Sequence, residues 1–278
     1  MCGRYASSAH PDELVEAYEV DLDATDQVSR SVLKNPQQPP AGEPDHNLAP
    51  SKQAPVVLTR RPREEPEAPP LRQLRLLTWG LVPSWATDPS VGARMTNARV
   101  ETLLDKPAFA KAAASRRCLV PATGWYEWQA SPVATDAKGK PRKQPFFVSR
   151  ADEAPLALAG LYEFWRDPAS PAEDPLSWVV SFTIVTTAAE PGLDRIHDRQ
   201  PLALEPAQWS DWLDPALTSP DDVRSLTEAA QVPGRFRAWP VGRAVGSPRS
   251  NGPTLMEPAD PAELEGVVDP GTGEVVGP

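Results

Sequence analysis

The sequence contains few of the residues that build disulfide frameworks or metal sites. Its 278 residues include two cysteines and three histidines. Cys2 and Cys118 lie far apart and cannot form a disulfide framework, which is typical of a protein from the reducing cytoplasm. Cys118 and His197 have no partners at the spacing of metal ligands. We therefore expect a cytoplasmic protein without a metal ion or other cofactor.

Long apolar runs are also missing. No stretch of about 18 apolar residues could span a bilayer, and the N-terminus lacks the basic and apolar segments of a secretory signal. We therefore expect no membrane partner. Hydrophobic residues nevertheless make up 40% of the chain and nine residues are tryptophan, which is enough for a sizeable core.

The chain also lacks the positive charge that would favour general coating of nucleic acid. Its formal charge is −10, with acidic residues concentrated at 12–26, 64–67 and 257–274. If the protein binds DNA, it must use a local basic groove. Lys138, Lys140, Arg142 and Lys143 could contact phosphate, although such a run is more commonly a solvated loop.

The hydrophobic pattern predicts more strands than helices and no regular βαβ alternation. Strands are expected at residues 56–58, 71–82, 118–128, 146–148, 156–161, 178–187 and 236–241. Helices are expected at 11–18, at 101–115 with Pro107 breaking or restarting the helix, at 206–213 and from 219 onward. Residues 35–44 should form a loop and residues 60–70 a disordered hairpin tip. The pattern favours an α+β fold with an antiparallel sheet that closes partly on itself. Residues 259–278 contain no aromatic residue and are expected to be an acidic disordered tail.

Cys2 would become the first residue after removal of Met1, which is normally trimmed before a small residue. It would then carry a thiol and a free α-amine, with reference pKa values of about 8.5 and about 7.7–8.0. An aldehyde can form an imine with this amine and close onto the sulfur as a thiazolidine. The same residue could act as an N-terminal nucleophile with its amine as base, or could be an accident of a frayed terminus.

Seven short blocks of sequence occur in a fixed order. They are MCGRY at 1–5, NLAP at 47–50, WGLVPSW at 79–85, NARVET at 97–102, RCLVPATGWYEW at 117–128, AGLYE at 159–163 and IHDRQPL at 196–202. This arrangement resembles the SOS response-associated peptidase (SRAP) family, the abasic-site shields that crosslink themselves to DNA. The resemblance runs to about residue 258 and departs from the family pattern at Gln200 and Ser247. It implies an α+β fold, a single domain over residues 2–258 with an antiparallel β-barrel-like core flanked by helices.

The resemblance implies a partner, an activity and a set of site residues. The implied partner is single-stranded DNA that contains abasic sites, including junctions with duplex, bound by a monomer in the cytoplasm and nucleoid during the DNA damage (SOS) response. The implied activity is a covalent thiazolidine crosslink with lyase-like chemistry, together with thiol autopeptidase activity that exposes Cys2. The implied catalytic residues are Cys2, Asn97, Glu127 and His197. The implied DNA-binding residues are Arg4, Asn47, Pro50, Trp85, Arg99 and Arg199.

Taken alone, these residues leave alternatives open. Glu127 would have a raised pKa if the flanking rings bury it, but it could lie on the solvent face of a strand. His197 could shuttle protons or be structural, and Trp85 could stack on bases or belong to the core. Asn97 and Arg99 could face the site together, or could be a capping residue and a surface ion pair.

Two other functions fit parts of the same sequence. A peptidase or amidase acting on other proteins would use Cys2 but would need no DNA groove. A non-catalytic single-strand binding module would need stacking residues and phosphate contacts but no Cys2.

Overall fold

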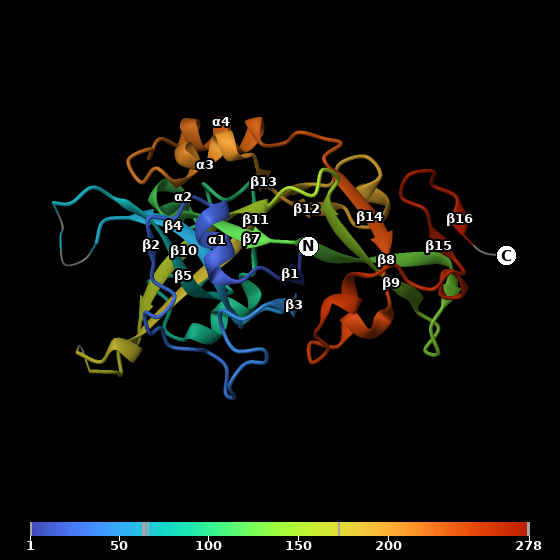
Figure 1. The fold of residues 1–278 in the computed structure, drawn as a ribbon, viewed down its shortest axis with the longest axis horizontal. Coiled ribbons are helices and arrows are strands. Elements are labelled where there is room, and N and C mark those ends of the chain that lie inside the picture. Colours follow the sequence, from blue (N-terminus) through green and yellow to red (C-terminus); the bar gives the residue numbers. More distant parts are fainter. Residues whose placement is uncertain (1, 63–64, 66, 172, 277–278) are drawn as a thin grey trace.

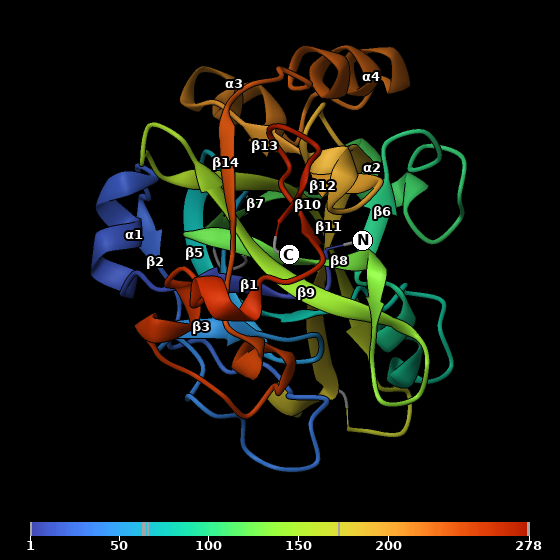
Figure 2. The same ribbon diagram turned by 90° about the vertical axis from the view of Figure 1, so that its right-hand side faces the viewer.

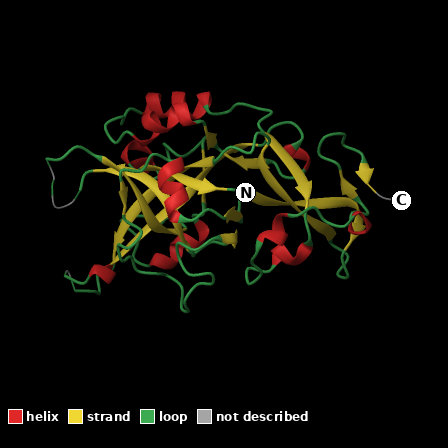
Figure 3. Ribbon diagram, in the orientation of Figure 1, coloured by secondary structure: helices red, strands yellow, loops and turns green. Residues whose placement is uncertain are grey.

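A computed structural model describes residues 2–62, 65, 67–171 and 173–276 of the chain. Strands dominate the molecule, and the helices lie on its outside (Figure 3). The strands form a barrel in one half of the molecule and a second sheet in the other half (Figure 1). The observed architecture confirms the predicted α+β fold with a barrel-like, mainly antiparallel core.

The barrel belongs to the larger sheet. Its path is closed because β11 pairs with both β10 and β5, so that five strands return to their starting point. These strands are β4 (Gln53–Arg60), β5 (Leu71–Trp79), β7 (Arg117–Ala122), β10 (Leu156–Arg166) and β11 (Trp178–Ala188). The short strands β2 (Leu22–Asp23), β6 (Asn97–Arg99), β12 (Arg199–Pro201) and β13 (Ala203–Leu204) pair with the barrel from outside this path.

The second sheet has the order β14-β9-β8-β1-β3. Its strands are β1 (Tyr5–Ser7), β3 (Asp45–Leu48), β8 (Gly124–Thr135), β9 (Pro141–Arg150) and β14 (Phe236–Pro240). Figure 2 shows these strands from the end of the molecule that carries β8 and β9. Gly124 lies where the chain leaves the barrel for this sheet. A Cβ at this position would lie 2.4 Å from the Val148 carbonyl oxygen, so the close approach of β8 and β9 requires glycine.

The helices are short and pack against the outside of the sheets. They are α1 (Pro11–Ala17), α2 (Ala110–Ser115), α3 (Pro206–Leu213) and α4 (Pro220–Ala229), with 3-10 turns at Pro89–Arg94, Pro175–Ser177, Leu193–Arg195, Arg243–Gly246, Pro253–Met256 and Pro261–Glu263. Within α3, Trp209 and Trp212 are buried, and Trp212 Nε1 donates to the Cys118 carbonyl at 2.9 Å. The helix is therefore fixed to barrel strand β7. No helix among the described residues is long and apolar enough to cross a membrane.

An aromatic cluster joins the barrel to the second sheet. Tyr5, Trp79, Trp125 and Phe182 are almost completely buried in one core cluster. Tyr5 meets Trp79 edge-on at 5.1 Å between ring centroids. This packing fixes β1, and with it the N-terminal segment, at the junction of the two sheets.

Most predicted elements occur, but the helix expected at 101–115 is shorter than predicted. Within 101–115 only Ala110–Ser115 is α-helical, because the preceding residues form turns around Pro107. Residues 60–70 do connect the antiparallel strands β4 and β5, but positions 63, 64 and 66 of that tip lie outside the described residues.

The expected disordered tail is instead a folded hairpin. Strands β15 (Val267–Val268) and β16 (Val275–Val276) pair with each other, and Val267 is only 1% exposed. Gln129 of β8 both donates to the Val268 carbonyl and accepts from its N–H, at 2.9 and 2.8 Å. One buried valine and this amide pairing order a segment whose composition is otherwise acidic and polar. Residues 277 and 278 lie outside the described part.

Candidate functional site

Cys2 lies three residues before the start of β1 at Tyr5. Tyr5 pairs with Trp125, and the hydrogen bond from Tyr126 N–H to the Arg4 carbonyl (2.9 Å) continues the pairing toward the N-terminus. This register places Cys2 beside the segment of β8 that carries Glu127. Cys2 is fully buried, and burial, followed by the charge of Glu127, raises the pKa of its thiol. The sulfur is therefore held as a protonated thiol.

Asn97 fixes the backbone of Cys2. Strand β6 runs parallel to β11 with Asn97 opposite Ile184, and Asn97 Nδ2 donates to the Cys2 carbonyl at 2.8 Å. The same amide group donates to Thr96 Oγ1 at 3.0 Å. Asn97 therefore contacts the backbone carbonyl oxygen of Cys2, and this hydrogen bond positions the residue.

Glu127 provides a carboxyl group that titrates near neutrality. Its side chain is 4% exposed, and burial raises its pKa to about 7, with a further increase from the charge of Asp198. About equal amounts of acid and carboxylate are therefore present at pH 7. Such a group can both accept and donate a proton under cellular conditions.

His197 lies on the segment that follows the turn Leu193–Arg195. Its Nδ1 accepts a hydrogen bond from Arg199 N–H at 3.0 Å, but also lies 2.8 Å from Asp198 Oδ1, a contact that requires a proton on Nδ1. Burial lowers the pKa of His197, which favours the neutral ring. The neutral ring carries one proton, on Nδ1 where it donates to Asp198 or on Nε2 where Nδ1 accepts from Arg199.

Three of the expected DNA-binding residues are accessible. Trp85 is 62% exposed, Arg99 is exposed and Pro50 is half-buried. Trp85 is therefore not a core residue. Arg99 projects from β6 two residues after Asn97, so the strand that fixes Cys2 also carries a cation.

The structure gives Asn47 a different role from the expected DNA contact. Its side chain is fully buried, and Nδ2 donates to the carbonyls of Val245, Ser247 and Ser250 at 3.2, 2.9 and 2.9 Å. Asn47 Oδ1 accepts from Arg4 Nη1 at 2.7 Å. No part of this amide is accessible to a DNA strand. Asn47 instead holds Arg4 and the loop around residue 247.

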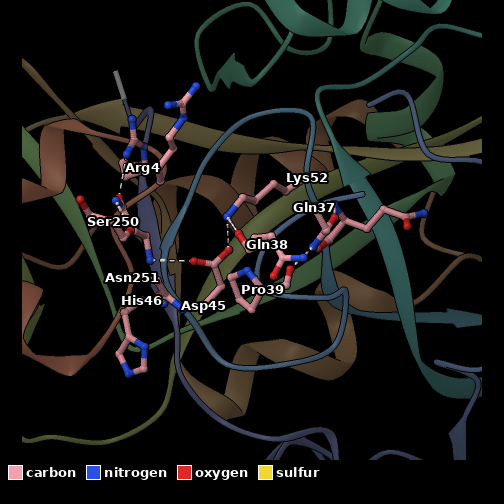
Figure 4. Close-up of polar contacts among 12 residues, drawn as sticks. Arg4, Gln37, Gln38, Pro39, Asp45, His46, Lys52, Ser250 and Asn251 are labelled. Atoms are coloured by element: carbon pink, nitrogen blue, oxygen red, sulfur yellow. Dashed lines mark hydrogen bonds and ion pairs between the residues drawn. The ribbon is translucent and has the colours of Figure 1, made fainter. Parts of the chain in front are cut away.

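A buried ion pair between Lys52 and Asp45 stabilises β3, the strand that also carries Asn47. Lys52 Nζ donates to Asp45 Oδ2 and to the Gln38 carbonyl, both at 2.6 Å, while Asp45 Oδ1 accepts from Asn47 N–H at 2.9 Å. Figure 4 shows Lys52 and Asp45 pointing toward each other beside Arg4. The position of Arg4 therefore depends on a network of buried polar groups.

Arg199 is also engaged in the protein. Its guanidinium donates to both carboxylate oxygens of Glu101 at 2.6 and 3.0 Å and to the Thr186 carbonyl at 2.7 Å. Only 11% of its side chain is exposed. A phosphate would have to share Arg199 with Glu101.

The comparison with known families agrees with this arrangement. The sequence model of the SOS response associated peptidase (SRAP) family matches residues 1–248. The chain belongs to the SRAP family. The similarity expected from the seven sequence blocks is thereby confirmed.

Individual SRAP relatives are similar along nearly the whole chain. The abasic site processing protein YoqW of Bacillus subtilis is 33% identical, with 92% of this chain and 99% of that protein covered. The abasic site processing protein YedK of Escherichia coli is 30% identical, with 93% and 100% covered. The abasic site processing protein HMCES of Rattus norvegicus is 28% identical, with 94% and 76% covered.

Two solved structures have a similar fold. A phage-related protein from Bordetella bronchiseptica has a TM-score of 0.58 at 30% identity, covering 86% of this chain and 94% of that one. A protein from Bacteroides thetaiotaomicron has a TM-score of 0.69 at 23% identity, covering 93% and 100%. The second similarity concerns the fold alone.

Sequence reasoning missed two charged residues of this SRAP site. Asp198 raises and Lys143 lowers the pKa of both Glu127 and His197. Asp198 could have been suspected because it adjoins His197. The sequence marks Lys143 only as part of a basic run, because only the β8–β9 pairing brings it near Glu127. Among the described residues, no cluster of His, Cys, Asp and Glu could hold a metal ion.

Proposed function

We propose that the protein binds abasic sites in single-stranded DNA and links to them through a thiazolidine at Cys2. The observation that carries this proposal is a buried thiol beside a carboxyl group with a pKa of about 7, on a backbone that Asn97 fixes at 2.8 Å. The names of the SRAP relatives, which are abasic site processing proteins, support the same substrate.

The reaction first requires a free amine on Cys2. Hydrolysis of the bond between residues 1 and 2 consumes one water and converts the Cys2 amide nitrogen into an amine. We assign this step to the protein itself or to general removal of Met1, a residue outside the described part of the structure. An autoproteolytic step would account for the peptidase in the family name.

The crosslink then forms in two balanced steps. The Cys2 amine adds to the C1 aldehyde of the ring-opened deoxyribose and water leaves, which gives an imine. The thiol then adds across the C=N bond, so that sulfur bonds to carbon and the thiol proton ends on nitrogen. Because the thiol pKa is raised, its proton must be removed as sulfur attacks, and ionised Glu127 is placed to accept it.

His197 acts on the sugar in this proposal. Its neutral ring can accept the proton of the C1 hydroxyl at its unprotonated nitrogen as the deoxyribose opens, and the imidazolium formed can deliver a proton to the ring oxygen. The same group would return a proton during reversal of the crosslink. Asn97 is a positioning residue because it contacts the Cys2 carbonyl.

The bound strand follows the accessible residues around this site. Arg99 provides a phosphate contact, while Trp85 and Pro50 supply surfaces for base stacking where a single strand meets a duplex. Arg4 and Arg199 add positive charge, but Arg4 is hydrogen-bonded to Asn47 and Arg199 is partly neutralised by Glu101. We propose that a monomer acts in this way on damaged DNA of the cytoplasm and nucleoid.

The test is a crosslinking assay with an abasic single-stranded oligonucleotide on a denaturing gel. Wild type and Cys118→Ala should form a heat-stable adduct, because Cys118 is a buried thiol within the barrel. Cys2→Ala should bind the DNA but form none. An adduct that survives in Cys2→Ala would refute the thiazolidine, and wild-type binding without any adduct would favour a non-catalytic binding module.

A further inference from the structure

A basic depression lies beyond the described site, at the free end of the β8–β9 hairpin. Its volume is about 560 Å³, and it is lined by Arg142, Gly242, Arg243, Ala244, Ala262 and Glu263. Arg142 belongs to β9, whereas Arg243 and Glu263 belong to the turns Arg243–Gly246 and Pro261–Glu263. Three separate segments therefore bring two guanidinium groups to one depression.

The two arginines are poorly satisfied by the protein. Arg142 Nη2 is inaccessible to solvent, and no hydrogen-bond partner for it occurs in the described part of the chain. Neither Arg142 nor Arg243 forms an ion pair with a described carboxylate, and Arg243 has only a 3.5 Å contact with the Glu263 carbonyl. A buried donor without a partner is unfavourable, so an anion that accepts from Arg142 Nη2 would be stabilised there.

The strand register relates this depression to the active site. Phe146 of β9 pairs directly with Glu127, and Arg142 lies four residues earlier on the same strand. Residues separated by an even number share one face of a strand, so Arg142 and Phe146 lie on the same face. At ~3.3 Å per residue their separation along β9 is about 13 Å, which a DNA strand running from the site must span to reach the depression.

Lys143 provides charge between these two places. It lies next to Arg142, and its charge lowers the pKa of both Glu127 and His197. The positive charge at this end of β9 therefore acts on Glu127 and His197 of the proposed site.

We propose that Arg142 and Arg243 bind a backbone phosphate of the DNA strand several nucleotides from the abasic site. This inference rests on the proposed function and adds a second anchoring point to it. Bidentate guanidinium groups suit the oxygens of a phosphodiester. The carboxylate of Glu263, in the same depression, repels a phosphate and therefore weakens its binding there.

The test measures binding without covalent chemistry. Fluorescence anisotropy would use single-stranded oligonucleotides with a tetrahydrofuran abasic analogue, which has no aldehyde. One oligonucleotide carries two nucleotides on each side of the lesion, and two others carry eight on the 5′ or the 3′ side. Because no adduct can form, failure of the crosslinking chemistry leaves this test unaffected.

Arg142→Ala and Arg243→Ala should each weaken binding of one long oligonucleotide by about 3- to 10-fold and leave the short one unchanged. The double variant should lower the salt slope by about 0.7 for that oligonucleotide, because one phosphate contact is lost. Glu263→Gln should strengthen its binding. Lys138→Ala, an exposed cation at the hairpin tip, is the matched control and should have little effect.

Three outcomes would overturn the proposal. The first is an equal loss for short and long oligonucleotides, and the second is no loss for either long one. The third combines two results. Inorganic phosphate raises the melting temperature of wild type but not of the double variant, and the double variant binds DNA as tightly as wild type does. That result would assign the depression to a free anion.

Discussion

The thiol of Cys2 differs from that of most nucleophilic cysteines. Reactive cysteines usually have a lowered pKa, whereas burial and Glu127 raise the pKa of this one. The first attack on an aldehyde would come from the amine, and the thiol would react only after the imine has formed. A protonated thiol is protected from oxidation until that point.

The pH dependence of crosslinking should report Glu127 directly. The Glu127 carboxyl, with a pKa of about 7, loses its ability to accept a proton as the pH falls below that value. The Cys2 amine is reactive only when it is neutral. From pH 5 to 6 the wild-type log rate should therefore rise with a slope near 2. Glu127→Gln should slow adduct formation by about 10²–10⁴-fold and retain a slope near 1.

Timed crosslinking between pH 5 and 9 would measure both quantities. His197→Ala is the comparison, because it should slow ring opening and reversal while leaving the final yield at long times nearly unchanged. Equal rates and slopes for Glu127→Gln and wild type would show that Glu127 is structural.

Some of these residue properties could be predicted and others could not. The raised pKa of Glu127 agrees with its position between two aromatic residues on one strand. The burial of Asn47 was not predictable, because its partners lie about 200 positions away in sequence. A local pattern cannot reveal such a contact.

At the scale of elements, Asn47 should be important for the loop that holds Arg4. Asn47→Ala removes the donors to three carbonyls and the acceptor for Arg4, so we expect the free energy of unfolding to fall by about 2–4 kcal/mol. Asn251→Ala is the control, because exposed Asn251 accepts one bond from His46 N–H and should cost less than about 1 kcal/mol. Urea unfolding would measure both, and equal losses would argue against a special role for Asn47.

The C-terminal hairpin makes a second prediction at this scale. Val267→Ala removes two buried methyl groups and should lower the free energy of unfolding by about 1–2 kcal/mol. Val275→Ala, on the paired strand but 45% exposed, should change it by less than about 0.5 kcal/mol. If the two variants are equally stable, residues 259–276 contribute no folding energy and behave as the tail that the sequence suggested.

Elements with strong local patterns were predicted well. Helix α3 has the expected bounds because tryptophans at helical spacing coincide with a proline at its first position. The region 101–115 was misjudged because its alanine-rich composition favours helix, while Pro107 and packing of Leu103 and Phe109 select turns. Closure of the barrel through β5 and β11 was expected only in part, since non-local pairing leaves little trace in sequence.

At the scale of the whole molecule, a protein with a net charge of −10 must bind DNA through local cations. Arg99→Glu should weaken binding of single-stranded DNA and reduce the salt slope by about 0.7, with little change in thermal stability because Arg99 is exposed. Lys138→Glu is the charge-matched control and should act more weakly. A larger effect of Lys138→Glu would place the strand on the opposite side of the site.

Arg199 should respond differently from Arg99 in the same titration. Arg199→Glu also breaks the bidentate pair with Glu101 and the bond to Thr186, so weaker DNA binding should be accompanied by a lower melting temperature. Thermal denaturation beside the salt titration separates the two contributions. A loss of DNA affinity without any loss of stability would identify Arg199 as a simple phosphate contact.

The most direct measurement locates the covalent bond. The adduct with an abasic oligonucleotide would be digested with trypsin and nuclease, and the N-terminal peptide of residues 2–4 sequenced by tandem mass spectrometry. The account predicts a peptide without residue 1 that carries the deoxyribose fragment on Cys2, with the loss of one water and no free thiol. Attachment to a lysine such as Lys143, or a modified peptide that still carries Met1, would contradict it.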